Sequence, residues 1–126
     1  MKIIRCLWGN VDHQFFEKNL ESYHSECGEA KIKDDEHGLD NQMVIVWDEV
    51  NCKFMEKLGY PYLYMGESKF DKQFNFFYKI LALERAMELY DEILFLDWDC
   101  FIQKPLDDAF YELVRSKGDI QMPLYF

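Results

Sequence analysis

Short apolar runs alternate along the chain with segments whose apolar residues recur at helical spacing. The apolar runs predict strands at 3–8, 43–47, 60–65 and 93–96. The periodic segments predict helices at 12–27, 51–58, 74–90 and 108–117. Strands that alternate with helices form mainly parallel sheets with right-handed crossovers, so we predict an α/β domain. A last apolar stretch, 119–126, predicts the start of a fifth strand.

The same spacing predicts which helix faces are buried. The inward residues of the first helix are expected to be Phe16, Leu20, Tyr23 and Cys27. The main seam of the third helix comprises Phe76, Ile80, Leu83 and Met87, with Phe77 and Leu81 beside it. The inward residues of the fourth helix are Phe110, Leu113 and Val114. Residues suited to helix ends are Asn10 or Asp12, Gly28, Gly59, Asp107 and Gly118.

The fourth apolar run ends in two aspartates, Asp97 and Asp99, which flank Trp98. If the strand continues through them, both carboxylates point to the same side, because strand side chains alternate. Two such charges repel each other unless a cation neutralises them. A hard divalent ion with oxygen ligands, Mg2+ or Mn2+, is the natural candidate. The alternative to a metal site is a pair of solvated aspartates at a strand end.

The segment 93–106 resembles the aspartate-any-aspartate (DxD) segment of glycosyltransferases with the GT-A fold. The resemblance is to the group of glycogenin-like and bacterial lipopolysaccharide galactosyltransferase-like enzymes. In these families a short apolar piece and a Lys-Pro-Leu-like turn follow the acidic pair, as at 101–102 and 104–106 here. A helix with a basic residue precedes the strand, as does 77–83 with Lys79. The resemblance implies a three-layer, Rossmann-like sheet of the GT-A type.

The resemblance also implies an activity. Such enzymes transfer a hexosyl group from a nucleotide-diphosphate sugar, most often a UDP-sugar, to a hydroxyl of a glycan, lipid or protein acceptor. By this likeness Asp99 binds Mn2+ or Mg2+ directly, and Asp97 shares the metal and hydrogen-bonds the ribose. Lys79 balances phosphate charge, although a solvated helix face is its bland alternative. Trp98 is expected to pack against a neighbouring strand, and no residue is assigned as catalytic.

The strand order 3-2-1-4, taken from the family, predicts further ligand contacts. It places the end of the first strand beside the acidic pair, at the point where the strand order reverses. Trp8, Gly9 and Asn10 there suit a nucleobase and ribose, and Asp48, after the second strand, is a weaker candidate for the same role. Taken singly, Trp8 suits a core edge and Asn10 a helix cap better than either suits a ligand contact.

Composition narrows the function classes. The chain of 126 residues has the size of one domain, and its net charge of −10 disfavours nucleic acid as a partner. No apolar run approaches the roughly 20 residues that span a bilayer. The first residues lack the apolar core and cleavage site of a signal peptide, so we expect a cytoplasmic protein.

The cysteines and histidines suggest no separate chemistry. The cysteines are widely spaced without a C-x-x-C pair and are expected to be reduced thiols, at Cys6, Cys27, Cys52 and Cys100. The histidines lie far from the acidic pair and are expected on the surface, at His13, His24 and His37.

One feature departs from the family pattern. Such enzymes usually add a metal-binding His well after the acidic pair, and this chain has no His after His37. We therefore expect 1–126 to be the N-terminal, donor-binding part of a GT-A domain without its acceptor-binding part, either as a fragment of a longer transferase or as an abbreviated protein that keeps donor binding but has lost turnover. A related nucleotidyltransferase is an alternative, although the Gly-rich phosphate loop expected after the first strand is absent. A non-catalytic binding module is the other.

Overall fold

The computed structural model describes residues 2–27, 42–69, 75–104, 106, 108–116 and 118. In chain order the elements are β1 (Lys2–Leu7), α1 (His13–Cys27), β2 (Gln42–Val46), α2 (Glu49–Leu58), β3 (Tyr62–Tyr64), α3 (Asn75–Leu89), β4 (Ile93–Phe95) and α4 (Asp108–Arg115). The predicted alternation of strands and helices is confirmed. The predicted strand at 119–126, the cap Asp107 and the stop Gly28 lie outside the described residues.

The strands form one parallel sheet with the order β3-β2-β1-β4. β1 is central and pairs with β2 from Ile3 opposite Gln42 to Leu7 opposite Val46. On its other side β1 pairs with β4, from Lys2 opposite Ile93. The predicted order 3-2-1-4 is therefore confirmed. β4 ends at Phe95 opposite Ile4, so the chain after β4 leaves the sheet beside the middle of β1, which continues to Leu7.

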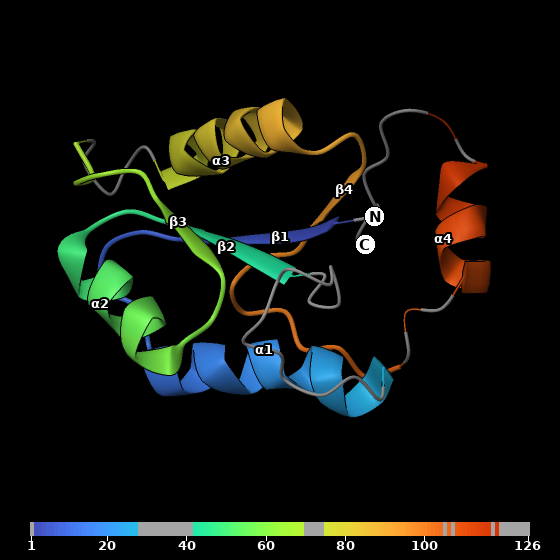
Figure 1. Cartoon of the computed structure of the whole chain (residues 1–126), viewed down its shortest axis with the longest axis horizontal. Coiled ribbons are helices and arrows are strands. Elements are labelled where there is room, and N and C mark those ends of the chain that lie inside the picture. The colour runs from blue at the N-terminus through green and yellow to red at the C-terminus, as the bar shows by residue number, and fades with distance from the viewer. Residues whose placement is uncertain are drawn as a thin grey trace.

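Helices cover both faces of the sheet, with α3 on one and α1 and α2 on the other (Figure 1). Alternating residues of β1 supply both cores. Ile4 and Cys6 pack with Tyr78 and Ala82 of α3, whereas Leu7 packs with Phe16 of α1. This three-layer α/β arrangement is compatible with a Rossmann-like fold. α4 stands to one side and buries none of its described side chains (Figure 1).

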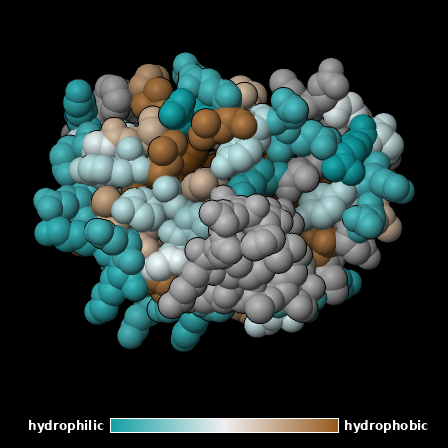
Figure 2. All heavy atoms as spheres, viewed as in Figure 1, coloured by the Kyte–Doolittle hydropathy of each residue, from teal (hydrophilic) through white to brown (hydrophobic). Residues whose placement is uncertain are grey.

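The predicted main seam of α3 is wrong at two positions, whereas Leu81 packs against the core as predicted and the side chain of Phe76 lies outside those that the structure describes. Ile80 and Met87 are 58% and 65% exposed, whereas Tyr78, Ala82 and Ala86 are buried. An apolar patch accordingly covers part of α3 on the surface (Figure 2). The two small alanines let the helix approach the sheet closely. Large apolar residues occur around most of α3, so their spacing did not identify the inward face.

Smaller corrections concern α4, α2 and the histidines. Leu113 of α4 is 59% exposed instead of facing inward. α2 begins at Glu49, so Asn51 is a fully buried residue within its first turn. His24 is buried rather than on the surface, and its Nε2 lies 2.9 Å from the Tyr60 hydroxyl. None of the helices in the described part of the chain is long and apolar enough to cross a membrane.

Candidate functional site

The acidic pair lies in a turn rather than on a strand. β4 ends at Phe95, and the last bond to β1 is donated by the Leu96 N–H to the Ile4 carbonyl, at 2.9 Å. The chain then bends, with the Cys100 N–H donating to the Asp97 carbonyl at 3.0 Å. The expectation that strand alternation aligns the two carboxylates is therefore wrong. Asp97 and Asp99 instead share one short loop at the carboxyl end of β4.

A buried arginine beneath this loop holds its backbone. Arg5 of β1 is fully buried, and its Nη1 donates to the carbonyls of Asp97 and Cys100, at 2.9 and 2.8 Å. Its Nε donates to Oε1 of Gln42 at 3.2 Å. Burial lowers the pKa of Arg5 from 12.5 to about 10, so the guanidinium remains charged at neutral pH. Arg5 was not among the predicted site residues, although a charge inside an apolar strand is a visible signal in the sequence.

Helix α1 fixes the same loop from the side. The Asn19 amide donates from Nδ2 to the Trp98 carbonyl at 3.0 Å, and the Ile102 N–H donates to the Ser22 hydroxyl at 2.9 Å. The Trp98 ring packs edge-on against Phe15 of α1, at 5.7 Å between centroids. Trp98 thus packs on a helix and not only against a neighbouring strand.

Lys79 of α3 reaches the acidic loop from the opposite face of the sheet. Its Nζ lies 2.7 Å from Oδ1 of Asp97, and the two side chains are 30% and 41% exposed. Asp99 is exposed. Two of the predicted site residues, Lys79 and Asp97, are therefore brought into contact. The alternative, a Lys79 side chain that is only solvated, does not agree with this ion pair.

Aromatic rings connect this pair to the ends of β1 and β2. Trp8 is half-buried and stacks on Tyr78 with 5.5 Å between centroids, and Trp47 meets the same ring edge-on at 5.1 Å. Tyr78 directly precedes Lys79 on α3. The end of β1 and the acidic loop therefore meet the same part of one helix. Asn10 is exposed in the turn that follows, and the cap of α1 is Asp12, whose Oδ1 accepts the Phe15 N–H at 3.1 Å.

Asp48 and Gly9 bind each other. The Asp48 carboxylate accepts the Gly9 N–H at 2.7 Å and the Ser68 N–H at 2.7 Å, and it also accepts the Ser68 hydroxyl. Asn51 donates from Nδ2 to the carbonyls of Gly9 and Trp47, at 3.0 and 2.9 Å. Asp48 itself has a positive φ of 74°. These contacts tie together the ends of β1 and β2 and the chain after β3, which favours a structural role for Asp48 over a ribose contact.

This arrangement predicts a pH dependence for Asp48. Burial alone would raise its pKa, but the hydrogen bonds from Ser68 and Gly9 outweigh burial and hold the pKa below the ordinary 3.8. A carboxyl group whose pKa is lower in the folded than in the unfolded state contributes its full stabilisation at pH values above its unfolded-state pKa. This stabilisation is lost as the pH falls through the folded-state pKa. We therefore expect the free-energy gap of unfolding between wild type and Asp48→Asn to be constant above about pH 5 and to shrink below 3.8. Urea titrations across that range measure the gap. A gap that stays constant down to about pH 2 would contradict this role.

Cys6 lies under the Lys79–Asp97 pair and is expected to be inert. Burial raises the pKa of its thiol from 9.0 to about 12, so the reactive thiolate is nearly absent at neutral pH. We expect iodoacetamide at about pH 8 to modify Cys6 only after unfolding in urea, whereas the half-buried Cys52 and Cys100 react sooner. Peptide mass spectrometry over time measures this order. Labelling of Cys6 as fast as Cys52 in the folded protein would contradict its burial. All three of these described cysteines are free, as predicted, and Cys27 has no described side chain.

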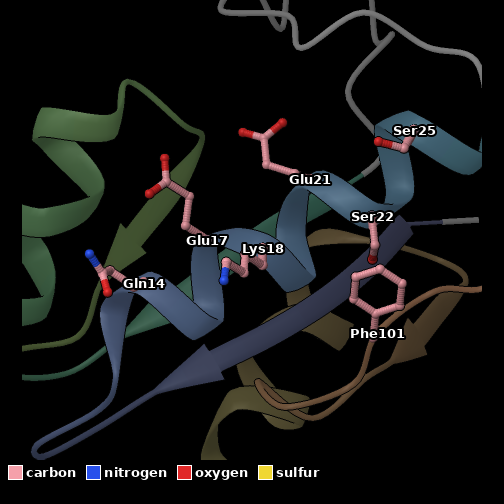
Figure 3. Close-up of a pocket in the computed structure, with 7 residues that line it drawn as sticks. All are labelled: Gln14, Glu17, Lys18, Glu21, Ser22, Ser25 and Phe101. Carbon is pink, nitrogen blue, oxygen red and sulfur yellow. The ribbon is translucent and has the colours of Figure 1, made fainter.

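A hollow of about 620 Å3 lies elsewhere, on the outer side of α1 (Figure 3). The residues that line it are Gln14, Glu17, Lys18, Glu21, Ser22, Ser25 and Phe101. The side chains of Glu17 and Glu21 extend outward from the helix, and Phe101 faces Ser22 (Figure 3). The hollow contains none of the predicted site residues and lies on the face of the sheet opposite to Lys79.

The chemistry of the acidic loop fits a hard divalent cation. Within the described residues no group of three or more His, Cys, Asp or Glu side chains surrounds a common point. Mg2+ and similar ions are commonly held by only one or two carboxylates, with water and substrate phosphates as the remaining ligands. Asp97 and Asp99 can supply those carboxylates, and Lys79 adds a cation beside Asp97. Comparisons of this chain with protein-family models, with curated proteins and with solved structures each found no match.

Proposed function

We propose that this chain is the donor-binding domain of a metal-dependent glycosyltransferase of the GT-A type. One observation carries the proposal: the strand order reverses between β1 and β4, and the acidic loop leaves the carboxyl end of β4 at that point. Open parallel α/β sheets bind their ligands at such a reversal. The expected ligand is a nucleotide-diphosphate sugar, preferably a UDP-sugar.

In this proposal Asp99 and Asp97 hold Mn2+ or Mg2+ against the diphosphate. The bound metal neutralises charge on the phosphates and on the nucleoside diphosphate as it leaves. The exposure of Asp99 leaves its carboxylate accessible, while Asp97 is half-exposed and already beside a cation. Lys79 would then exchange part of its contact with Asp97 for a phosphate oxygen. The ammonium of Lys79, which lies beside the loop, favours an anionic ligand there.

The aromatic end of β1 supplies the other half of the proposed site. Trp8 stacks on Tyr78, and the next residue of α3, Lys79, pairs with Asp97 of the loop. A nucleotide held at the loop would therefore extend toward Trp8. Gly9 is less suited to contact phosphate, because Asp48 already accepts its N–H. This last contact also weakens the nucleotidyltransferase alternative, in which free backbone N–H groups after the first strand would cradle a triphosphate.

Thermal unfolding with UDP, GDP or UTP, each with and without Mn2+, tests the proposal. A ligand at about 100 times its dissociation constant stabilises the fold by about 2.7 kcal/mol. We expect that stabilisation with UDP only when Mn2+ is present. A clear preference for UTP would instead favour a nucleotidyltransferase. No shift under any of these conditions would contradict nucleotide binding and leave a binding module of another kind.

A further inference from the structure

The backbone of the acidic loop is held by polar side chains that emerge from the sheet and from α1. Arg5 donates hydrogen bonds to the carbonyls of Asp97 and Cys100, and Asn19 donates one to the carbonyl of Trp98. The acceptors of Arg5 in the described residues are carbonyl and amide oxygens, contributed by β2, α1 and the loop. These bonds join positions separated by up to 95 residues in the chain.

We propose that Arg5 is a positioning residue of the acidic loop, which sets the geometry in which Asp97 and Asp99 meet the metal. The inference rests on the proposed function and deepens it. The guanidinium binds the carbonyls on both sides of the turn, at positions 97 and 100, so it fixes the span that contains both carboxylates. Its charge also lies beneath two anions and offsets their mutual repulsion before a metal arrives.

The residue type supports a role beyond packing. A fully buried charge in the central strand is costly, and an apolar side chain of similar volume often serves a core at least as well. Arginine offers several N–H donors in a rigid planar fork, whereas lysine offers one flexible ammonium. Only the fork can bind Gln42 through Nε while Nη1 binds the two loop carbonyls. When a residue that orients metal ligands without touching the metal is substituted, the metal affinity typically changes by about 10- to 100-fold.

The test compares Mn2+ affinity in the presence of UDP for the wild type, Arg5→Lys and Asn19→Ala. Asn19→Ala removes the side-chain bond to Trp98 but keeps the Asn19 backbone carbonyl that accepts from Arg5, so it tests the loop contact if Arg5→Lys does not fold. Ala86→Gly is the matched control, because it destabilises the buried face of α3 while the partners of Arg5 and of the acidic loop stay unchanged. Circular dichroism and urea titration establish that each variant is folded and how much stability it has lost.

We expect Arg5→Lys to weaken Mn2+ binding by about tenfold or more, and Asn19→Ala to weaken it by a smaller factor. Ala86→Gly should lose about 1 kcal/mol of stability while its Mn2+ affinity stays within about twofold of the wild type. Wild-type affinity in folded Arg5→Lys and Asn19→Ala would overturn the positioning role alone. An equal loss of Mn2+ affinity in Ala86→Gly would also overturn it, because the effect would then follow stability. Failure of the wild type to bind Mn2+ and UDP would overturn the proposed function together with this inference.

Discussion

Asp99→Asn is expected to abolish the Mn2+-dependent stabilisation by UDP while the free protein keeps its fold. The substitution removes the negative charge of the proposed metal ligand but keeps the shape of an exposed side chain, so we expect little change in the stability of the free protein. With UDP at about 100 times its wild-type dissociation constant, the expected loss is about 2.7 kcal/mol of ligand-induced stability. Thermal unfolding with and without Mn2+ measures it.

Asp91→Asn is the matched control for this variant. Asp91 is also exposed and lies just before β4, at the opposite end of the strand from the acidic loop. It should keep the full Mn2+-dependent shift. Asp97→Asn is less informative alone, because it also breaks the ion pair with Lys79. A full shift in Asp99→Asn, equal to that in Asp91→Asn, would show that the carboxylate of Asp99 does not hold the metal.

The second large effect is expected in the core beneath the site. Tyr78→Ala should reduce the free energy of unfolding by about 3 to 5 kcal/mol, the usual loss when a buried aromatic side chain is truncated. Tyr78 is 1% exposed and packs against both Trp8 and Trp47. Its removal leaves a cavity between α3 and the ends of two strands. Equilibrium urea unfolding measures the loss.

Phe77→Ala, at the preceding position, is the control. Phe77 is 43% exposed, so its truncation should cost well under half as much as Tyr78→Ala. The comparison also tests the orientation of α3, which spacing alone predicted incorrectly. Equal losses for the two variants would mean that the helix presents a different face to the sheet.

The order of elements was predictable because its signals are local. Each strand is a short apolar run, and each helix carries its own periodicity and end signals, as with Asp12 before α1 and Gly59 after α2. The strand order 3-2-1-4 came from the family resemblance of 93–106, and the structure bears it out. The acidic pair was also visible locally, since charge follows an apolar run at Asp97.

The contacts around the acidic loop were not predictable from local patterns. Arg5 meets the Asp97 carbonyl across 92 positions of sequence, and Asp48 meets Gly9 across 39. Such pairs depend on which strands become neighbours, and periodicity does not contain that information. The turn at 97–100 was missed for the same reason, because the bonds from Arg5 and Asn19 that accompany it come from distant elements.

Electron paramagnetic resonance of Mn2+ tests the central claim most directly, because free Mn2+ gives a sharp signal that weakens when the ion is bound. In the presence of UDP, increasing amounts of protein should remove the free signal with a stoichiometry of about one ion per chain, as expected for a single carboxylate site. UDP alone corrects for binding by the nucleotide, and the double variant Asp97→Asn with Asp99→Asn should behave like that blank. If the wild-type protein leaves the Mn2+ signal at the level of UDP alone, the acidic loop of β4 does not hold a metal and the glycosyltransferase proposal is contradicted.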